Sequence, residues 1–119
     1  MTHDEMNRLA ATRVMGWSIS VAECGPNSLC SYECECYYHQ NKFIVDVKDF
    51  NPCTSIADAW ILVEKMMKDG FEMMLCTSGE DKTKAQCNIF LNKVVKGDKK
   101  ADTAPLVITM ACLQAKGVK

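Results

Sequence analysis

The stretch NPCTSIADAWILVEKMMKDG, residues 51–70, is the clearest helical segment of the chain. Pro52 cannot lie inside a helix, and Ser55 followed by Asp58 is typical of a helix N-terminus. Gly70 supplies the left-handed conformation with which many helices end. The segment therefore predicts one helix in the middle of the chain, between Ser55 and Gly70.

Apolar residues in this helix recur at helical spacing. Ile56, Trp60, Val63 and Met67 lie three or four positions apart and so share one face. Such a stripe predicts the face that packs on the core. We expect Trp60 to be one of its large buried side chains.

On the N-terminal side, a capping box of Thr2 and Glu5 begins a helix over about residues 3–15. Alternating apolar and polar residues then predict strands in WSISVAE (17–23), YECECYY (32–38) and FIVDV (43–47). The connections are too short for crossovers, so these strands are expected to pair antiparallel.

On the C-terminal side, FEMMLCT (71–77) and AQCNIFLN (85–92) read as two further strands around a polar loop. KVVKGDKKAD (93–102) reads as a polar connection. The last helix spans about residues 104–114, with Pro105 in its first turn. The sequence thus predicts one α+β domain over residues 1–119, of order α-β-β-β-α-β-β-α. We expect a three-layer α/β/α sandwich in which helices cover a mostly antiparallel sheet.

Composition excludes several classes of protein. The chain has 119 residues, 48% of them hydrophobic, and a formal net charge of −1, which argues against binding to a nucleic acid polymer. No apolar run reaches the roughly 18 residues of a membrane span, and no signal peptide is visible. A cytoplasmic location is expected, in which the eight cysteines stay reduced.

Motifs for metal binding and catalysis are weak. Cys30, Cys34, Cys36 and His39 could be ligands, but their spacing does not match the paired C-x₂-C of zinc ribbons. The sequence contains no nucleophile elbow, phosphate-binding loop or dinucleotide fingerprint. We expect no metal, no cofactor and no enzymatic activity, with a cysteine-dependent hydrolase as an alternative.

Features that indicate a binding site are clearer than those for metal binding or catalysis. The helix that begins at Thr103 and Ala104 exposes unpaired N–H groups that accept an anion, unless Asp102 or Thr103 caps them. Phe90 is able to stack on a base, or to fill the core. Asn92 and Asn88 lie two positions on either side of Phe90, and each offers an amide for a base or a ribose. Alternatively, this face of the strand is exposed to solvent.

Four segments carry a resemblance: RVMGW (13–17), FNPCTSIADAWILVEKM (50–66), the aromatic-led strand after Gly70, and ADTAPLVITMACLQA (101–115). Together they resemble the phage ABA sandwich domain family. The chain is also similar to the Thoeris anti-defence sponges, phage proteins that sequester cyclic ADP-ribose isomers, and in some cases cyclic oligonucleotides, without cleaving them.

The resemblance implies a homo-oligomeric phage or prophage protein in the cytoplasm of an infected bacterium. Its partner would be a cyclic nucleotide immune signal. Thr103 and Ala104 would hold phosphate, with Arg8 or Arg13 beside it. Phe90 would stack and Asn92 would read sugar or base. An alternative is an anti-CRISPR-like inhibitor that binds a host defence protein through an apolar patch around Tyr37 and Tyr38, and another is a phage accessory protein of a different role.

Overall fold

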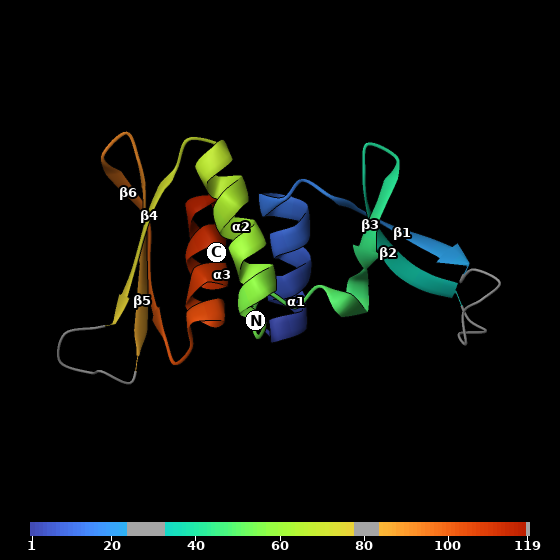
Figure 1. The fold of residues 1–119 in the computed structure, drawn as a ribbon, viewed down its shortest axis with the longest axis horizontal. Coiled ribbons are helices and arrows are strands. Elements are labelled where there is room, and N and C mark those ends of the chain that lie inside the picture. The colour runs from blue at the N-terminus through green and yellow to red at the C-terminus, as the bar shows by residue number, and fades with distance from the viewer. Residues whose placement is uncertain (24–32, 78–83, 119) are drawn as a thin grey trace.

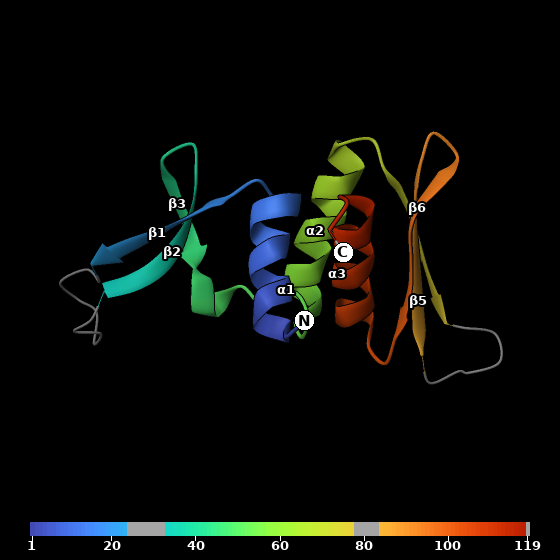
Figure 2. The ribbon, with the colours of Figure 1, turned by 180° about the vertical axis from the view of Figure 1, so that it is seen from behind.

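In the part of the chain that the structure describes, three α-helices form the middle of the protein, and a three-stranded antiparallel sheet lies on each side of them (Figure 1). The computed structural model describes residues 1–23, 33–77 and 84–118. Seen from behind, the same order of sheet, helices and sheet is evident (Figure 2). The molecule is therefore long in one direction, with extents of 52 × 30 × 22 Å.

The first sheet follows the N-terminal helix. Helix α1 (His3–Leu9) begins at Thr2, whose hydroxyl accepts a hydrogen bond from the Glu5 amide, and continues into a π-helical turn (Ala10–Val14). The sheet then comprises β1 (Ser18–Glu23), β2 (Glu33–His39) and β3 (Lys42–Asp46), in the order β1-β2-β3, and a 3₁₀ turn follows at Val47–Asp49.

The second half repeats this plan. Helix α2 (Ile56–Lys68) begins at Ser55, whose hydroxyl accepts a hydrogen bond from the Asp58 amide, as the sequence predicts. The second sheet has the order β4-β5-β6, from β4 (Glu72–Thr77), β5 (Ala85–Leu91) and β6 (Val94–Ala101). Helix α3 (Ala104–Ala115) closes the fold.

The α+β class and the antiparallel pairing are confirmed. The layers differ from the expected order, because the helices lie between two sheets rather than outside one sheet. The predicted connection over residues 93–102 is instead strand β6. Its composition is polar because β6 is an edge strand with mostly exposed side chains. Its buried Gly97 is needed there, since a Cβ would lie 2.6 Å from the Ala111 carbonyl oxygen of α3.

The core lies between the helices and the second sheet. Helix α3 is apolar on nearly all sides, because α1, α2, β5 and β6 surround it. The fully buried side chains include Leu62, Met66, Cys87, Ile89, Val107 and Ile108.

The predicted buried stripe of α2 is wrong for three of its four residues. Only Val63 is buried, whereas Ile56, Trp60 and Met67 are at least half exposed. The face that packs on the core is instead made by Ala59, Leu62, Val63 and Met66. Trp60 lies beside this face rather than on it.

Three aromatic rings attach the first sheet to the helices. Trp17 lies with its ring centroid 5.0 Å from that of Phe50 and 5.7 Å from that of Tyr37. The ring centroids of Tyr37 and Phe50 are 6.0 Å apart, and the rings are nearly perpendicular. Tyr37 is fully buried, so the patch expected around Tyr37 and Tyr38 does not include it.

Candidate functional site

A cleft of about 460 Å³ opens between α1, strand β2 and the segment that follows β3. Such a volume falls in the range of small-molecule sites. The residues that line it are Asp4, Asn7, Arg8, Glu35, Tyr37, Asp46, Val47, Lys48, Phe50 and Asn51.

Local structure brings these side chains together. Asp4 and Arg8 are four positions apart on α1 and so share one face of the helix. Glu35 and Tyr37 alternate along β2 and point to the same side of the sheet. The third wall is fixed by Asn51, whose backbone N–H donates to Asp58 Oδ2 at 2.8 Å and whose side-chain amide donates to the Lys48 carbonyl at 2.9 Å.

Arg8 and Glu35 form a two-pronged ion pair across the mouth of the cleft. Arg8 Nη1 lies 2.7 Å from Glu35 Oε2, and Nη2 lies 3.4 Å from Oε1. The hydrogen bond from Arg8 lowers the pKa of Glu35, and the hydrogen bond to Glu35 raises the pKa of Arg8. Both side chains are nearly half exposed, so water screens the pair and a competing anion is able to reach Arg8.

Tyr37 presents an unusual polar group to the same cleft. The residue is fully buried, yet its hydroxyl has no hydrogen-bond partner among the residues that the structure describes. Burial raises the pKa of this hydroxyl, so it stays protonated and keeps its capacity to donate. Since nearly all buried polar groups are paired, this hydroxyl suits an acceptor on a bound molecule.

The remaining polar groups divide by charge. Lys48 joins Arg8 as a cation, while Asp4 and Asp46 add two carboxylates to Glu35. One carboxylate oxygen of Asp46 accepts a weak hydrogen bond from the Cys36 thiol, at 3.3 Å. The amide oxygen of Asn7 accepts from the Cys53 backbone N–H at 3.0 Å, which joins α1 to the start of α2. The cleft can thus receive both an anionic group and several hydrogen-bond donors.

Of the six residues predicted from sequence to bind the ligand, Arg8 alone lines this cleft. Arg13 lies in the π-helical turn and Phe90 in β5. Asn92 occupies the tight turn between β5 and β6 with a φ of +52°. This left-handed conformation explains why an asparagine stands at this position, because asparagine tolerates it better than most residues do.

Thr103 and Ala104 lie at the other end of the second sheet. Thr103 makes no side-chain capping bond, so the first amides of α3 have no cap from this hydroxyl. The eight residues of β6 separate this terminus from Asn92, a span of about 25 Å at strand rise. One small ligand cannot touch both places within a single chain. The roles predicted for Arg13, Phe90, Asn92, Thr103 and Ala104 stay predictions.

Buried thiols in the described part of the chain are poor nucleophiles. Burial raises the pKa of Cys53 and of Cys87 to about 11, and raises that of Cys112 still further. Within the described ranges, no group of three potential ligands could hold a metal ion. Cys30 and the side chain of Cys34, two of the ligands considered from sequence, lie outside what the structure describes.

Sequence patterns predicted the site only in part. The alternation of YECECYY places Glu35 and Tyr37 on one face, which is the side that meets α1. Nothing in the pattern indicated that this face would meet Asp4 and Arg8, or that Lys48 would complete the wall. A second cavity, of about 480 Å³, is lined mainly by apolar side chains and lacks such convergence of polar groups.

Comparisons with known proteins agree with the resemblance seen in the sequence. The sequence model of the phage ABA sandwich domain family matches residues 8–113, which include both sheets and all three helices in whole or in part. No curated protein and no solved structure matches the chain. Across the described residues, none of the helices has the length and apolar character needed to cross a bilayer. The chain belongs to the phage ABA sandwich domain family.

Proposed function

We propose that this chain is a phage accessory protein that binds and sequesters a cyclic nucleotide immune signal, such as a cyclic ADP-ribose isomer, without cleaving it. The observation that carries the proposal is the mixed-charge cleft with the hydroxyl of Tyr37, which has no partner among the residues that the structure describes. Family membership supports the coarser part, since the domain is a phage domain and suggests a phage accessory role.

A nucleotide complements both halves of the cleft. Its phosphates match Arg8 and Lys48, and Arg8 keeps N–H groups beyond those it gives to Glu35. The ribose hydroxyls and the amino group of adenine are donors, which match the carboxylates of Asp4 and Asp46. Tyr37 would donate its hydroxyl to a phosphate or ring oxygen. A simple inorganic anion would satisfy only the cationic half.

Capture without turnover fits the chemistry of the surroundings. Cleavage of a glycosidic or phosphate bond needs an activated nucleophile, a general acid or a metal ion. The buried thiols of the described residues have raised pKa values, the opposite of activation. Sequestration needs only affinity, and the proposal therefore excludes product formation.

Calorimetry with cyclic ADP-ribose isomers and cyclic dinucleotides tests the proposal. Heat-denatured complex should release the ligand intact, as identified by chromatography and mass spectrometry. Arg8→Ala should weaken binding at least about tenfold, because a charged hydrogen bond is lost. Lys42→Ala is a matched control, since Lys42 is exposed and does not line the cleft.

Two results would contradict the proposal. If the protein binds none of the nucleotides, the proposed function is wrong. If the ligand is converted to a product, the protein is an enzyme and does not merely sequester the ligand. A third result would relocate the site: if Thr103→Ala abolishes binding while Arg8→Ala does not, the ligand lies at the start of α3 and the cleft has another role.

A further inference from the structure

The cavity between α1, α3 and β6 has a volume of about 480 Å³, which falls in the range of small-molecule sites. Its walls are mainly apolar, with two polar side chains among them. The residues that matter for its chemistry are Met6, Met110, Leu113, Val118, Lys99 and Gln114.

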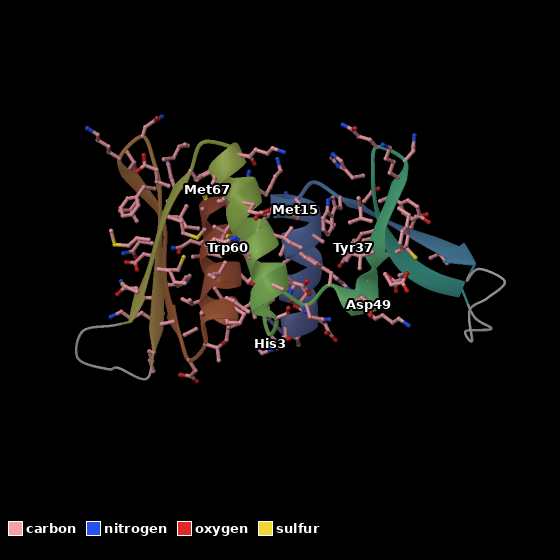
Figure 3. All side chains as sticks on the ribbon, in the orientation of Figure 1. His3, Met15, Tyr37, Asp49, Trp60 and Met67 are labelled. Atoms are coloured by element: carbon pink, nitrogen blue, oxygen red, sulfur yellow. The ribbon has the colours of Figure 1, made fainter. Side chains whose placement is uncertain are left out.

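This cavity is separate from the cleft that Tyr37 lines. Met6 lies two positions from Asp4 and from Arg8, which puts it on the opposite face of α1. Figure 3 shows Tyr37 on the side of α1 that faces the first sheet, whereas α3 lies on the other side of α1. The two cavities share no residue, so an inference about this one does not depend on the proposed function.

The apolar walls are built largely on α3. Met110 and Leu113 are three positions apart and share one face of the helix. After the helix, the Val118 N–H donates to the Leu113 carbonyl at 2.9 Å, which turns the chain back so that Val118 also lines the cavity. Methionine side chains are unbranched and flexible, so Met6 and Met110 adapt to apolar groups of different shape.

Lys99 is unusual for its place in the sheet. It is paired with Cys87, which is fully buried, and residues directly opposite one another in neighbouring strands point to the same side. Gly97 and Ala101, two positions on either side of Lys99, are also buried. Lys99 therefore projects from the inner face of β6 toward the helices, where most side chains are apolar.

The side-chain nitrogen atoms at this cavity are available only as donors. Lys99 forms no ion pair with any described residue, and no carboxylate side chain among the described residues lines the cavity. Gln114 accepts a hydrogen bond from the Asp98 N–H at its Oε1 atom, at 2.8 Å, which leaves its amide N–H groups as donors. A molecule that enters the cavity thus meets apolar walls, several donors and one positive charge.

We propose that this cavity binds an amphipathic anion, a small molecule with an apolar body and a single carboxylate, of which a medium-chain fatty acid is the simplest example. The apolar body lies against Met6, Met110 and Val118, and its burial supplies most of the affinity. The carboxylate accepts hydrogen bonds from Lys99 and Gln114, and this charge-assisted pairing selects an anion over a neutral or cationic molecule.

An inward-pointing lysine also has a purely structural use. On an edge strand such as β6, it opposes pairing with another strand. That use requires the charge alone and makes no selection among ligands. Lys100 is the comparison residue, because it follows Lys99 in the same strand and is exposed on the outer face.

Titration of the full chain with decanoate, decanol and decylamine tests the chemistry of the site. Decanoate should bind with a dissociation constant below about 1 mM, and about tenfold more tightly than decanol or decylamine, because only decanoate pairs with the lysine. Methionine methyl NMR locates the ligand. The signals of Met6 and Met110 should shift, while those of Met67 and Met74, which are 60% and 55% exposed on α2 and β4, should not.

Three variants separate the charge from the apolar walls. Lys99→Gln keeps a polar side chain but loses the charge, so it should weaken the binding of decanoate about tenfold and leave that of decanol unchanged. Lys100→Gln, the matched control, should change neither. Met6→Gln should weaken the binding of both, because it makes the wall polar. Thermal unfolding checks that each variant is folded.

Four results would overturn the inference. They are no binding of decanoate up to about 1 mM, equal affinity for decanoate and decanol, equal effects of Lys99→Gln and Lys100→Gln, and equal shifts of all four methionine signals. The last result would mean that the ligand adsorbs to any exposed apolar side chain. None of these results bears on nucleotide binding in the cleft, which Arg8→Ala tests separately.

Discussion

Tyr37 combines an aromatic ring that the core uses with a hydroxyl that the core leaves unpaired. The ring packs against Trp17 and Phe50, while the buried oxygen has no partner among the described residues. A buried hydroxyl without a hydrogen bond costs about 1–3 kcal/mol of folding free energy. The hydroxyl therefore adds nothing to the stability of the unliganded protein, and a bound acceptor would give it a partner.

Tyr37→Phe separates the two roles. The free energy of unfolding without ligand should stay equal or rise by about 1 kcal/mol, because the ring remains and the unpaired oxygen is removed. Nucleotide affinity should fall several-fold in the same variant. Urea unfolding and calorimetry measure the two quantities. A loss of stability above about 1 kcal/mol would show that the hydroxyl is satisfied in the folded protein.

At the scale of elements, the sequence of α2 determines where the helix begins and ends but not which of its faces is buried. Its start at Ser55 and its end near Gly70 are set by local chemistry and were predicted correctly. Its buried face was not, because Ile56, Trp60, Val63 and Met67 satisfy the helical period as well as the true core residues do. Periodicity gives a face but does not say which of two adjacent apolar stripes meets the rest of the fold.

A pair of substitutions in α2 tests the assignment. Leu62→Ala should destabilise the protein by about 2–5 kcal/mol, since Leu62 is fully buried. Trp60→Ala should cost only about 1–2 kcal/mol, because half of the side chain already lies in water. Thermal unfolding of both variants measures the two losses of stability. Equal losses would mean that Trp60 is a core residue.

One carboxylate links the ends of α2 and α3. Asp69 accepts hydrogen bonds from Lys65 at 2.9 Å and from Lys116 at 3.2 Å. The Lys65 bond is the main cause of its lowered pKa, and the folded value therefore lies below the unfolded one. The stabilisation is fully present above the unfolded pKa and is lost as pH falls through the folded pKa.

Asp69→Asn should therefore lower the free energy of unfolding at neutral pH and leave it unchanged in acid. We expect a loss of about 0.5–1 kcal/mol near pH 7, a modest amount because the pair is partly exposed, and convergence with the parent protein near about pH 2. Urea unfolding at several pH values measures both. A constant difference across this pH range would mean that the carboxylate charge is not responsible.

At the scale of the whole molecule, long-range contacts explain what sequence could not predict. The predicted strands were largely right, but local patterns did not indicate that they would divide into two sheets on opposite sides of the helices. The cleft is also a tertiary product, since Arg8 and Glu35 are 27 positions apart and meet only when the first sheet docks on α1. The periodicity of a short sequence segment cannot indicate a contact between residues so far apart in the chain.

The first sheet is the loosely attached part of this shape. The radius of gyration is 15.5 Å, larger than the roughly 13–14 Å expected for a compact chain of this length. Ile19, Val21 and Phe43 of this sheet are exposed, whereas Cys87 and Ile89 of β5 are fully buried. The sheet is held chiefly by the Trp17–Tyr37–Phe50 cluster and the Arg8–Glu35 pair.

Hydrogen exchange should therefore reveal two levels of protection. Amides of β2 should open at a lower free energy than those of β5, whose exchange requires the core to unfold. Phe50→Leu removes ring contacts at the attachment, so it should speed exchange in β2 much more than in β5. Mass spectrometry of peptic fragments resolves the two strands. Equal acceleration in both would mean that the sheets unfold as one cooperative unit, and that the cleft is as rigid as the core.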